Sequence, residues 1–278
     1  MANREQMVES EKRRSPLSDR EIEEADDRSS TTAKVVHEAI RLEGTEELER
    51  PASSVGWSGF AAGLTMGCSM LAQGLLQTRL PDAPWRELVA SFGYCLGFLF
   101  VTMGRQQLFT ETTLTVMLPY LKGTHRMVDV GRYWAIVFVA NIVATSLFAA
   151  AVSIPHLFPA EALQSFAKLG IKAVEPGFVG VLIKAVFAGW LIALMVWLMP
   201  AAASAKLLII VAVTWLIAVA QFSHVIAGSL EASFAAMNGA ITWGDYLIGF
   251  LIPAFIGNSI GGVVFVALLN HAQVKAEI

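Results

Sequence analysis

The body of this chain has very few charged residues. Residues 1–50 hold 14 of the 23 acidic and 9 of the 20 basic residues, which leaves 9 and 11 for the remaining 228 positions. Hydrophobic residues make up 55% of the chain and the mean hydropathy is +0.57, so the composition excludes an ordinary soluble domain. The sequence therefore predicts an integral protein of the lipid bilayer with an acidic N-terminal tail.

Cysteine is scarce, and the signatures of common enzyme classes are missing. Cys68 and Cys95 both lie in apolar runs, which argues against a disulfide framework or a cysteine metal site. The chain has no Gly-x-Gly-x-x-Gly fingerprint, no P-loop and no His-Glu-x-x-His motif. The glycines of "GNSIGG", residues 257–262, are typical of close helix contacts instead. We therefore expect no enzymatic activity, no cofactor or metal, and no nucleic-acid partner.

The N-terminal tail divides in two by composition. Residues 1–30 mix Arg, Glu, Asp and Ser without apolar periodicity, and we expect them to be disordered. Over residues 31–45 apolar side chains recur at helical spacing after a threonine, which predicts a short amphipathic helix near the membrane surface. The polar start argues against a secretory signal peptide. The predicted domains are thus a cytoplasmic tail, 1–50, and a transmembrane channel domain, 51–278.

Six apolar stretches are long enough to cross a bilayer as helices, which takes about twenty residues each. They lie at approximately 56–78, 87–120, 131–153, 178–199, 205–236 and 243–270. Two of the connecting loops, Lys122–Arg132 and the one that ends at Lys206, are basic, whereas the loops on the other side are mixed or acidic. Because basic loops mark the cytoplasmic side, both termini are predicted to lie in the cytoplasm.

The second and fifth stretches are too long and too irregular to be simple helices. The segment "GRQQLFTETT" interrupts the second at residues 104–113, and "QFSHVIAGS" interrupts the fifth at residues 221–229. Irregular backbone at membrane depth is tolerated only where protein or a water-filled cavity satisfies its polar groups. Both breaks are therefore expected to face the interior of the protein.

Each half of the body then contains an intact, a broken and an intact helix. Because three spans form each half, the second half enters the membrane from the opposite side, which predicts a 3+3 inverted repeat with a solute site at the midplane. The spacing agrees with this prediction: Asn141 follows Thr110 by 31 residues, and Asn258 follows His224 by 34. These two asparagines are therefore candidate accessory residues.

His224 and Thr110 are the candidate solute-binding residues of the two breaks. A neutral imidazole has one N–H donor, which suits a small weak-acid anion. The alternative is a structural histidine that hydrogen-bonds across a helix interface. The Thr110 hydroxyl could meet the same solute from the other side, or it could cap the half-helix that begins there; the two roles are compatible.

Three charged residues of the body are candidate accessory residues. Arg105 and Glu111 flank the sequence "QQLFT", and we expect them to pair with each other or to reach water at a vestibule rather than to bind the solute. Lys184 lies well inside the fourth stretch. It could draw anions into an outer vestibule, or it could snorkel to the membrane interface.

Several apolar side chains adjoin the breaks and could form constrictions that gate by dewetting. They are Tyr94, Phe98, Leu108, Phe109 and Ile217. A constriction of this kind holds back water and ions until a side chain moves or a solute enters. Ordinary helix packing is the alternative for each of them.

Three segments resemble the formate/nitrite transporter family: "LFTETT" at 108–113, "FSHVIAGS" at 222–229 and "IPAFIGNSIGGVVFVAL" at 252–268. The resemblance covers roughly residues 33–270, and the long charged tail is similar to the YfdC-like branch. It implies an all-α membrane protein with an aquaporin-like fold of six transmembrane helices, in which helices 2 and 5 are broken. It also implies a homopentamer in the bacterial inner membrane, with one pore for small monovalent weak-acid anions such as formate or nitrite in each protomer.

Within this resemblance, His224 matches the central pore histidine, and Thr110 matches the threonine in the broken second helix. The apolar residues of the loop and of the narrow parts of the pore are matched by Leu108, Phe109, Tyr94, Phe98 and Ile217. The histidine would donate a hydrogen bond, or the proton itself, so that the anion crosses as, or nearly as, a neutral acid. The family commonly has a glutamate and an asparagine where this chain has Ser223 and Gly228.

Two other functions fit the sequence. One is an aquaporin-like channel for neutral solutes, although the chain lacks the Asn-Pro-Ala pair that such channels place at the tips of their half-helices. The other is a weakly conducting membrane scaffold or sensor whose acidic tail binds a partner. Flux measurements with anions and with neutral solutes separate these functions from a passive or proton-coupled anion pathway.

Overall fold

The structure is a computed structural model that describes residue 18 and residues 31–276. Within these residues the chain is helical apart from its loops and contains no β-strand. The disorder predicted for residues 1–30 lies outside the described residues, Ser18 apart. The first described helix, α3 (Ala33–Glu49), covers most of the predicted amphipathic segment and continues beyond it.

Among the described residues, five helices are long and apolar enough to cross a membrane, judged by length and composition. They are α4 (Ala52–Arg79), α5 (Arg86–Met103), α8 (Met127–Val152), α10 (Gly177–Leu198) with the 3₁₀ turn that follows it, and the helical run Asp245–Ala276. The fifth predicted stretch instead forms two shorter apolar helices, α11 (Lys206–Val219) and α12 (Val225–Met237). The chain is therefore an all-α protein with the composition of a multi-pass membrane protein.

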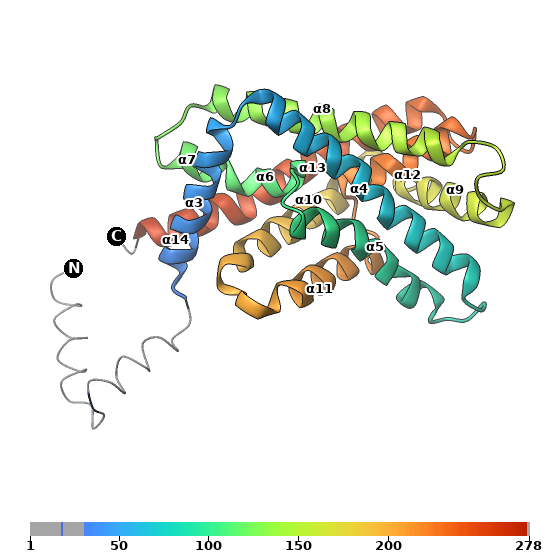
Figure 1. The fold of residues 1–278 in the computed structure, drawn as a ribbon, viewed down its shortest axis with the longest axis horizontal. Coiled ribbons are helices and arrows are strands. Elements are labelled where there is room, and N and C mark those ends of the chain that lie inside the picture. Colours follow the sequence, from blue (N-terminus) through green and yellow to red (C-terminus); the bar gives the residue numbers. More distant parts are fainter. Residues whose placement is uncertain (1–17, 19–30, 277–278) are drawn as a thin grey trace.

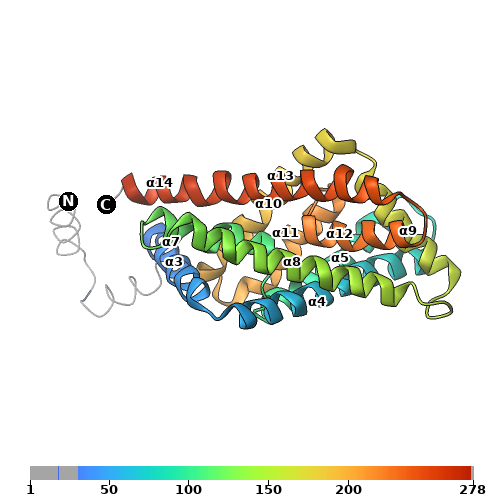
Figure 2. The same ribbon diagram turned by 90° about the horizontal axis from the view of Figure 1, so that it is seen from above.

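The remaining elements are short pieces at the breaks and ends. After α5 come α6 (Phe109–Thr115) and α7 (Met117–Leu121), and α10 is joined to α11 by η1 (Met199–Ala201) and η2 (Ala203–Ala205). The last run consists of η3 (Asp245–Leu251), α13 (Ile252–Gly262), η4 (Val263–Leu268) and α14 (Leu269–Ala276), of which η3 and η4 are π-helical. Figure 2 shows α13 and α14 in one line along the bundle.

The two halves of the body interlock through their half-helices. In the first half α4 packs against α5 and α8, and in the second half α10 packs against α13. The half-helix α6 contacts α10 and α13 of the second half, whereas α12 contacts α4 and α8 of the first. Figure 1 shows α6 toward the end of the bundle that carries α3, and α12 toward the end that carries α9 (Ala160–Val174). This exchange agrees with the 3+3 inverted repeat, which stays a prediction.

Glycines let α10 and α13 approach closely. A Cβ atom added at Gly189, Gly257 or Gly261 would lie 2.2, 2.5 or 2.2 Å from a backbone oxygen of the facing helix. Such distances leave no room for a side chain. The close helix contacts predicted for "GNSIGG" are therefore confirmed.

Helix α9 (Ala160–Val174) lies outside all six predicted stretches. Its 15 residues are too short to cross a bilayer, and it packs against α12 and α4 with buried residues that include Phe166 and Leu169. An apolar face at helical spacing is typical of an amphipathic helix. Because α9 is shorter than a membrane span, the length of the apolar stretches does not predict it. Helix α9 lies at the end of the bundle opposite to α3, α7 and α14 (Figure 1).

We predict that Gly189→Ala destabilises the protein because its methyl group would meet the backbone of α13. Overpacking of this kind costs about 1–3 kcal/mol, so the apparent melting temperature of the protein in detergent should fall. The control is Gly131→Ala in α8, where nothing lies within 4 Å of the added methyl group. Equal melting temperatures for the two variants would contradict the close packing of α10 and α13.

Candidate functional site

The two helix breaks have the same backbone conformation. After α5, Arg105 adopts a left-handed conformation with a φ of 50°, and after α11 Gln221 does so with a φ of 53°. In both places the next amide donates to the carbonyl five residues earlier, at 3.0 and 2.9 Å. This is the Schellman motif, which ends a helix while satisfying its last carbonyls. The sequence thus predicts the two breaks correctly, and one type of turn builds both.

An asparagine from a neighbouring helix holds the first loop. The Oδ1 atom of Asn141 accepts a hydrogen bond from the Phe109 amide at 3.0 Å. Its Nδ2 atom donates to the carbonyls of Gly59 and Gln107 at 2.7 and 3.0 Å. The side chain is fully buried, so it satisfies backbone groups that no water reaches.

Asn258 makes the matching set of contacts in the second half. Its Oδ1 atom accepts from the Val225 amide at 2.8 Å. Its Nδ2 atom donates to the carbonyls of Ala185 and Ser223 at 2.7 and 2.9 Å. The two predicted accessory asparagines therefore act on the backbone of the breaks.

These contacts correct the register of the two halves. Asn141 binds the amide of Phe109, and Asn258 binds the amide of Val225. The residues just before these amides, Leu108 and His224, therefore occupy equivalent positions, 33 and 34 residues before their asparagines. Thr110 is not the counterpart of the histidine. It is the second residue of α6, and the residue that precedes this half-helix is Leu108, which makes no side-chain cap. The capping role considered for Thr110 is therefore wrong.

His224 uses both ring nitrogens in hydrogen bonds. Nδ1 accepts the Ala227 amide at 3.2 Å, which caps α12, so the ring proton is placed on Nε2 by this network. Nε2 then donates to the Thr110 hydroxyl oxygen at 2.7 Å. The Phe98 ring lies edge-on to the imidazole, with centroids 4.8 Å apart. The structure thus brings the histidine and the threonine of the two breaks into direct contact.

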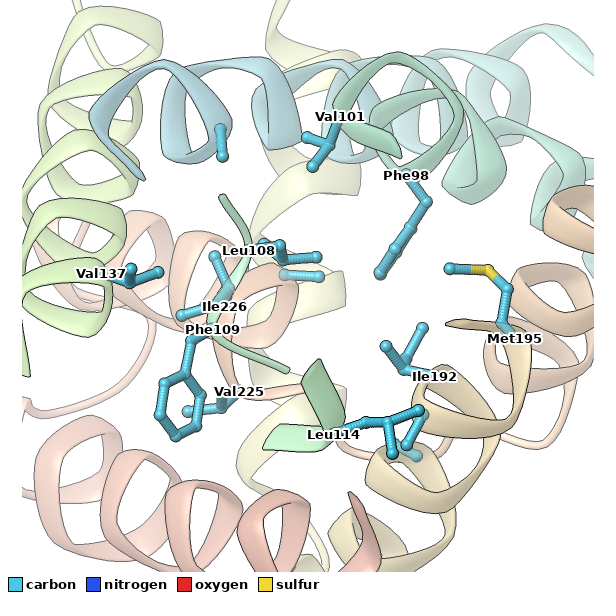
Figure 3. Packing of buried hydrophobic residues seen from close by; sticks show 14 of the residues in the cluster. Phe98, Val101, Leu108, Phe109, Leu114, Val137, Ile192, Met195, Val225 and Ile226 are labelled. Atoms are coloured by element: carbon cyan, nitrogen blue, oxygen red, sulfur yellow. The ribbon is translucent and has the colours of Figure 1, made fainter. Parts of the chain in front are cut away.

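The contact between Thr110 and His224 is buried beside the main apolar cluster, to which the Phe98 ring next to the imidazole belongs. Four side chains of this cluster without exposed surface come from α5, the first loop and α10: Phe98, Leu108, Ile192 and Met195. Figure 3 shows these four side chains directed toward a common space. Because Thr110 and His224 are themselves buried, we treat their contact and these four side chains as one dry barrier.

Phe109 lies outside this barrier. Its ring stacks on Phe255 with centroids 5.0 Å apart, and it meets Phe138 edge-on at 5.2 Å. Figure 3 shows the ring directed away from Phe98. The side chain therefore packs between α8 and α13, as the packing alternative expected, and only the backbone amide of Phe109 acts on the loop.

A cavity of about 70 Å³ opens on the α9 side of the barrier and has room for a small solute. Four predicted site residues line it, namely Tyr94, Ile217, Ser223 and His224. The other lining residues near the histidine are Gln73, Gly228, Glu231 and Phe250. The cavity thus leads from the α9 end of the bundle to the imidazole.

The cation of this vestibule is Lys172 of α9 rather than Lys184. The Lys172 ammonium forms an ion pair with Glu87 of α5 at 2.6 Å, and both residues line the cavity. Lys184 is half-buried on α10 and is not among the described residues that line the cavities on either side of the barrier. The sequence does not predict Lys172 as a site residue because α9, which carries it, is not among the predicted helices.

Glu231 is a second site residue that sequence reasoning misses. It lies two turns after His224 on α12 and lines the same cavity. Within the described part of the chain, Glu231 has neither an ion pair nor a hydrogen-bond partner. A signal was present in the sequence, because a carboxyl group inside an apolar stretch is rare and marks a functional site by default.

A second cavity, of about 640 Å³, lies on the other side of the barrier, next to α3. Glu111 lines it and accepts a hydrogen bond from the Thr102 hydroxyl at 2.8 Å. Arg105 also lines it but pairs with Glu43 of α3 at 3.7 Å. Burial raises the pKa of Glu43, against the opposite effect of Arg105. Both predicted residues therefore reach a vestibule, and the predicted pair between them is wrong.

Helix α3 is tied to the first loop and to the C-terminal helix. Glu47 accepts hydrogen bonds from the Tyr133 hydroxyl at 2.7 Å and from the Gln107 side chain at 2.8 Å. Near the start of α3, His37 contacts His271 of α14 with 3.1 Å between ring nitrogens. Burial, followed by the neighbouring His271, lowers the pKa of His37. The neutral histidine is thus the form that favours docking of α3 on the body.

Comparison with known proteins finds relatives by sequence and by structure. The sequence model described as "Formate/nitrite transporter" matches residues 34–272. The inner membrane protein YfdC of Escherichia coli is 39% identical over 262 residues, which cover 93% of this chain and 84% of that protein. The formate channel BtFdhC of Bacillus thuringiensis is 24% identical over 243 residues, 85% of this chain and 93% of that one.

Two solved structures share the fold. A structure titled "FNT family ion channel" superposes with a TM-score of 0.76 at 19% identity and covers 86% of this chain and 98% of that one. A structure titled "Pentameric formate channel with formate bound" has a TM-score of 0.68 at 18% identity and covers 81% of this chain and 98% of that one. At these identities the likeness shows the fold alone.

We predict that Asn258→Leu destabilises the protein much more than a matched change elsewhere. The substitution leaves the Val225 amide and two carbonyls without partners, and each orphaned buried group costs about 1–3 kcal/mol. The control is Asn270→Leu, because Asn270 donates a single hydrogen bond within its own helix, at 3.0 Å. Melting temperatures in detergent test the difference, and equal losses would show that Asn258 does not support the break.

Proposed function

Because the chain belongs to the formate/nitrite transporter family, we propose that it conducts small monovalent weak-acid anions, such as formate or nitrite, past His224 and Thr110. Transport is passive or coupled to protons. The observation that supports this proposal is the 2.7 Å hydrogen bond between the two side chains, inside a dry barrier with a cavity on each side. The chain is thus a membrane transport protein rather than an enzyme.

The apolar barrier decides in which form the substrate crosses. A bare anion would lose its hydration among Phe98, Leu108 and Ile192, at a cost that their apolar side chains do not offset. The substrate therefore crosses as, or nearly as, a neutral acid. Since His224 donates to the Thr110 oxygen, the hydroxyl hydrogen of Thr110 is free to bind a substrate oxygen in the narrowest part of the path.

We further propose a homopentamer in the bacterial inner membrane, with one pathway in each protomer and both termini in the cytoplasm. The names of two relatives support this: one is an inner membrane protein, and one solved relative is a pentameric formate channel. The basic loop after α7 lies at the same end of the bundle as α3 and α14 (Figure 1). Residues 1–50 form the cytoplasmic tail, and 51–278 form the channel domain.

We expect the purified full-length protein in proteoliposomes to take up formate or nitrite. His224→Ala should slow uptake about tenfold or more, because the lost buried hydrogen bond costs about 1–3 kcal/mol and about 1.4 kcal/mol corresponds to tenfold in rate. The control is His125→Ala in the loop before α8. Uptake of glycerol or water alone would favour an aquaporin-like channel. If an intact oligomer conducts none of these solutes, the result would favour a membrane scaffold or sensor.

The assembly proposal predicts a native mass of about five times the 30.0 kDa chain. Native mass spectrometry of the protein in detergent measures this directly. A monodisperse species of any other multiple would contradict the pentamer, while leaving the pathway within one chain unaffected.

A further inference from the structure

The proton that neutralises the substrate needs a source, and His224 is poorly placed to supply it. Its Nδ1 atom accepts a hydrogen bond from the Ala227 amide at 3.2 Å. Its Nε2–H group donates a hydrogen bond to the Thr110 hydroxyl oxygen at 2.7 Å. A second proton on Nδ1 would set one N–H group against another and remove the cap of α12. The ring is therefore held in its neutral form by its own contacts.

Two carboxyl groups flank the barrier, one in each cavity. Glu231 lines the cavity that leads to His224, and Glu111 lines the cavity next to α3. Phe98 lies on α5 between residues of the two cavities, one turn after Tyr94 and one turn before Thr102. Charged side chains at membrane depth are costly, and Asp, Glu and His chains form the proton relays of membrane transporters.

The groups around Glu231 leave it without a compensating cation. Lys172 of α9 is neutralised by its ion pair with Glu87 of α5. The other polar side chains that line this cavity carry no charge; they are Gln73, Tyr94, Gln221, Ser223 and the capping His224. The remaining charged residues of α9, α4 and η3, which pack against α12, do not line it; they are Glu161, Lys168, Arg79 and Asp245. The ionisable residues of α8 lie in its first two turns, beside α3. Among the described residues, this vestibule therefore carries an excess negative charge whenever Glu231 is ionised.

Glu111 lies in a more mixed environment. Two of the cations near it are already paired, Arg105 with Glu43 and Arg50 with Glu47. The remaining charged residues that line the cavity are Lys206 and Glu46. The hydrogen bond that Glu111 accepts comes from the uncharged Thr102 hydroxyl. The carboxyl is thus free to gain or lose a proton without breaking an ion pair.

We propose that Glu231 and Glu111 exchange the transported proton with the substrate, one on each side of the barrier. This inference rests on the proposed function. On the α9 side the Glu231 carboxyl gives its proton to the anion, which yields the neutral acid and the Glu231 carboxylate. The neutral acid crosses past Thr110, gives its proton to the Glu111 carboxylate and leaves as the anion. Water reprotonates Glu231 and takes the proton from Glu111, so one proton moves with each anion.

The test measures formate uptake and proton uptake together, with the full-length protein in proteoliposomes across a pH series. Glu231→Gln and Glu111→Gln should each slow both fluxes about 100-fold, the low end of what a positioned proton donor contributes, and should flatten the pH profile. Glu231→Asp keeps a carboxyl group and should restore part of the rate. The matched control is Glu161→Gln on α9, an exposed position outside both cavities, which should behave like the unchanged protein.

A further variant distinguishes the carboxyl groups from the histidine as the proton source. Asparagine at position 224 can still cap α12. If the carboxyl groups carry the proton, His224→Asn slows uptake but keeps one proton for each anion. If the histidine carries it, the ratio of protons to anions falls in His224→Asn and stays at one in Glu231→Gln, which would overturn the inference.

The outcomes separate this inference from the function on which it rests. If the unchanged protein takes up formate and Glu231→Gln has the same rate and pH profile, the inference is wrong and the proposed function stands. If the unchanged protein takes up no weak acid, both are wrong. Should Glu231→Gln fail to assemble, infrared difference spectra of the unchanged protein decide: a protonated-carboxyl band that does not respond to formate overturns the inference.

Discussion

A helix that stops inside a membrane leaves amides and carbonyls without partners, and the rest of this structure depends on how two asparagines satisfy them. A carboxamide offers one acceptor and two donor hydrogens without carrying a charge. Asn141 and Asn258 use all three, each joining an intact helix to the two residues that flank the tip of a break. An aspartate would offer no donor, and a leucine would offer nothing. Because the breaks are held in this way, their side chains can point into the core without collapse of the backbone.

The asymmetry of the site follows from one matched pair of positions. Leu108 and His224 occupy the same place in two similar loops. Leu108 is apolar and makes no cap, whereas His224 caps α12 and hydrogen-bonds Thr110. The surroundings of the histidine also differ from the usual family pattern. A Cβ atom at Gly228 would lie 2.2 Å from the Phe250 ring, so the ring occupies the space that a larger residue would need. Neither Ser223 nor Gly228 offers the carboxyl group found near the histidine in the family; here Glu231 provides one two turns later.

Features that depend on the local residue pattern, such as the two helix breaks, are predicted from the sequence. Features that depend on which distant segments pair with each other are not. Polar residues inside apolar stretches reveal both breaks, because few other arrangements tolerate them at membrane depth. The predicted pairing of Thr110 with His224 is wrong because Leu108 and His224 share no chemistry, and only the backbone hydrogen bonds to Asn141 and Asn258 show that they match. The expected partnership of Arg105 with Glu111 was wrong for a related reason, since α3 folds over the first loop and supplies Glu43 instead. Contacts between segments far apart in the chain produce no periodic pattern in the sequence, so the sequence does not predict them.

The dry barrier and the carboxyl groups on either side of it depend on each other. A proton or an anion alone carries a full charge, and moving either through the space between Phe98 and Leu108 costs far more than moving their neutral combination. If water filled the barrier, each ion could cross separately and the carboxyl groups would not affect the ratio of protons to anions. If the carboxyl groups were absent, the barrier would slow the anion at both entrances, because a neutral His224 has no proton to spare. In the proposed mechanism, tight packing around the Thr110–His224 contact therefore makes the proton and the anion travel together.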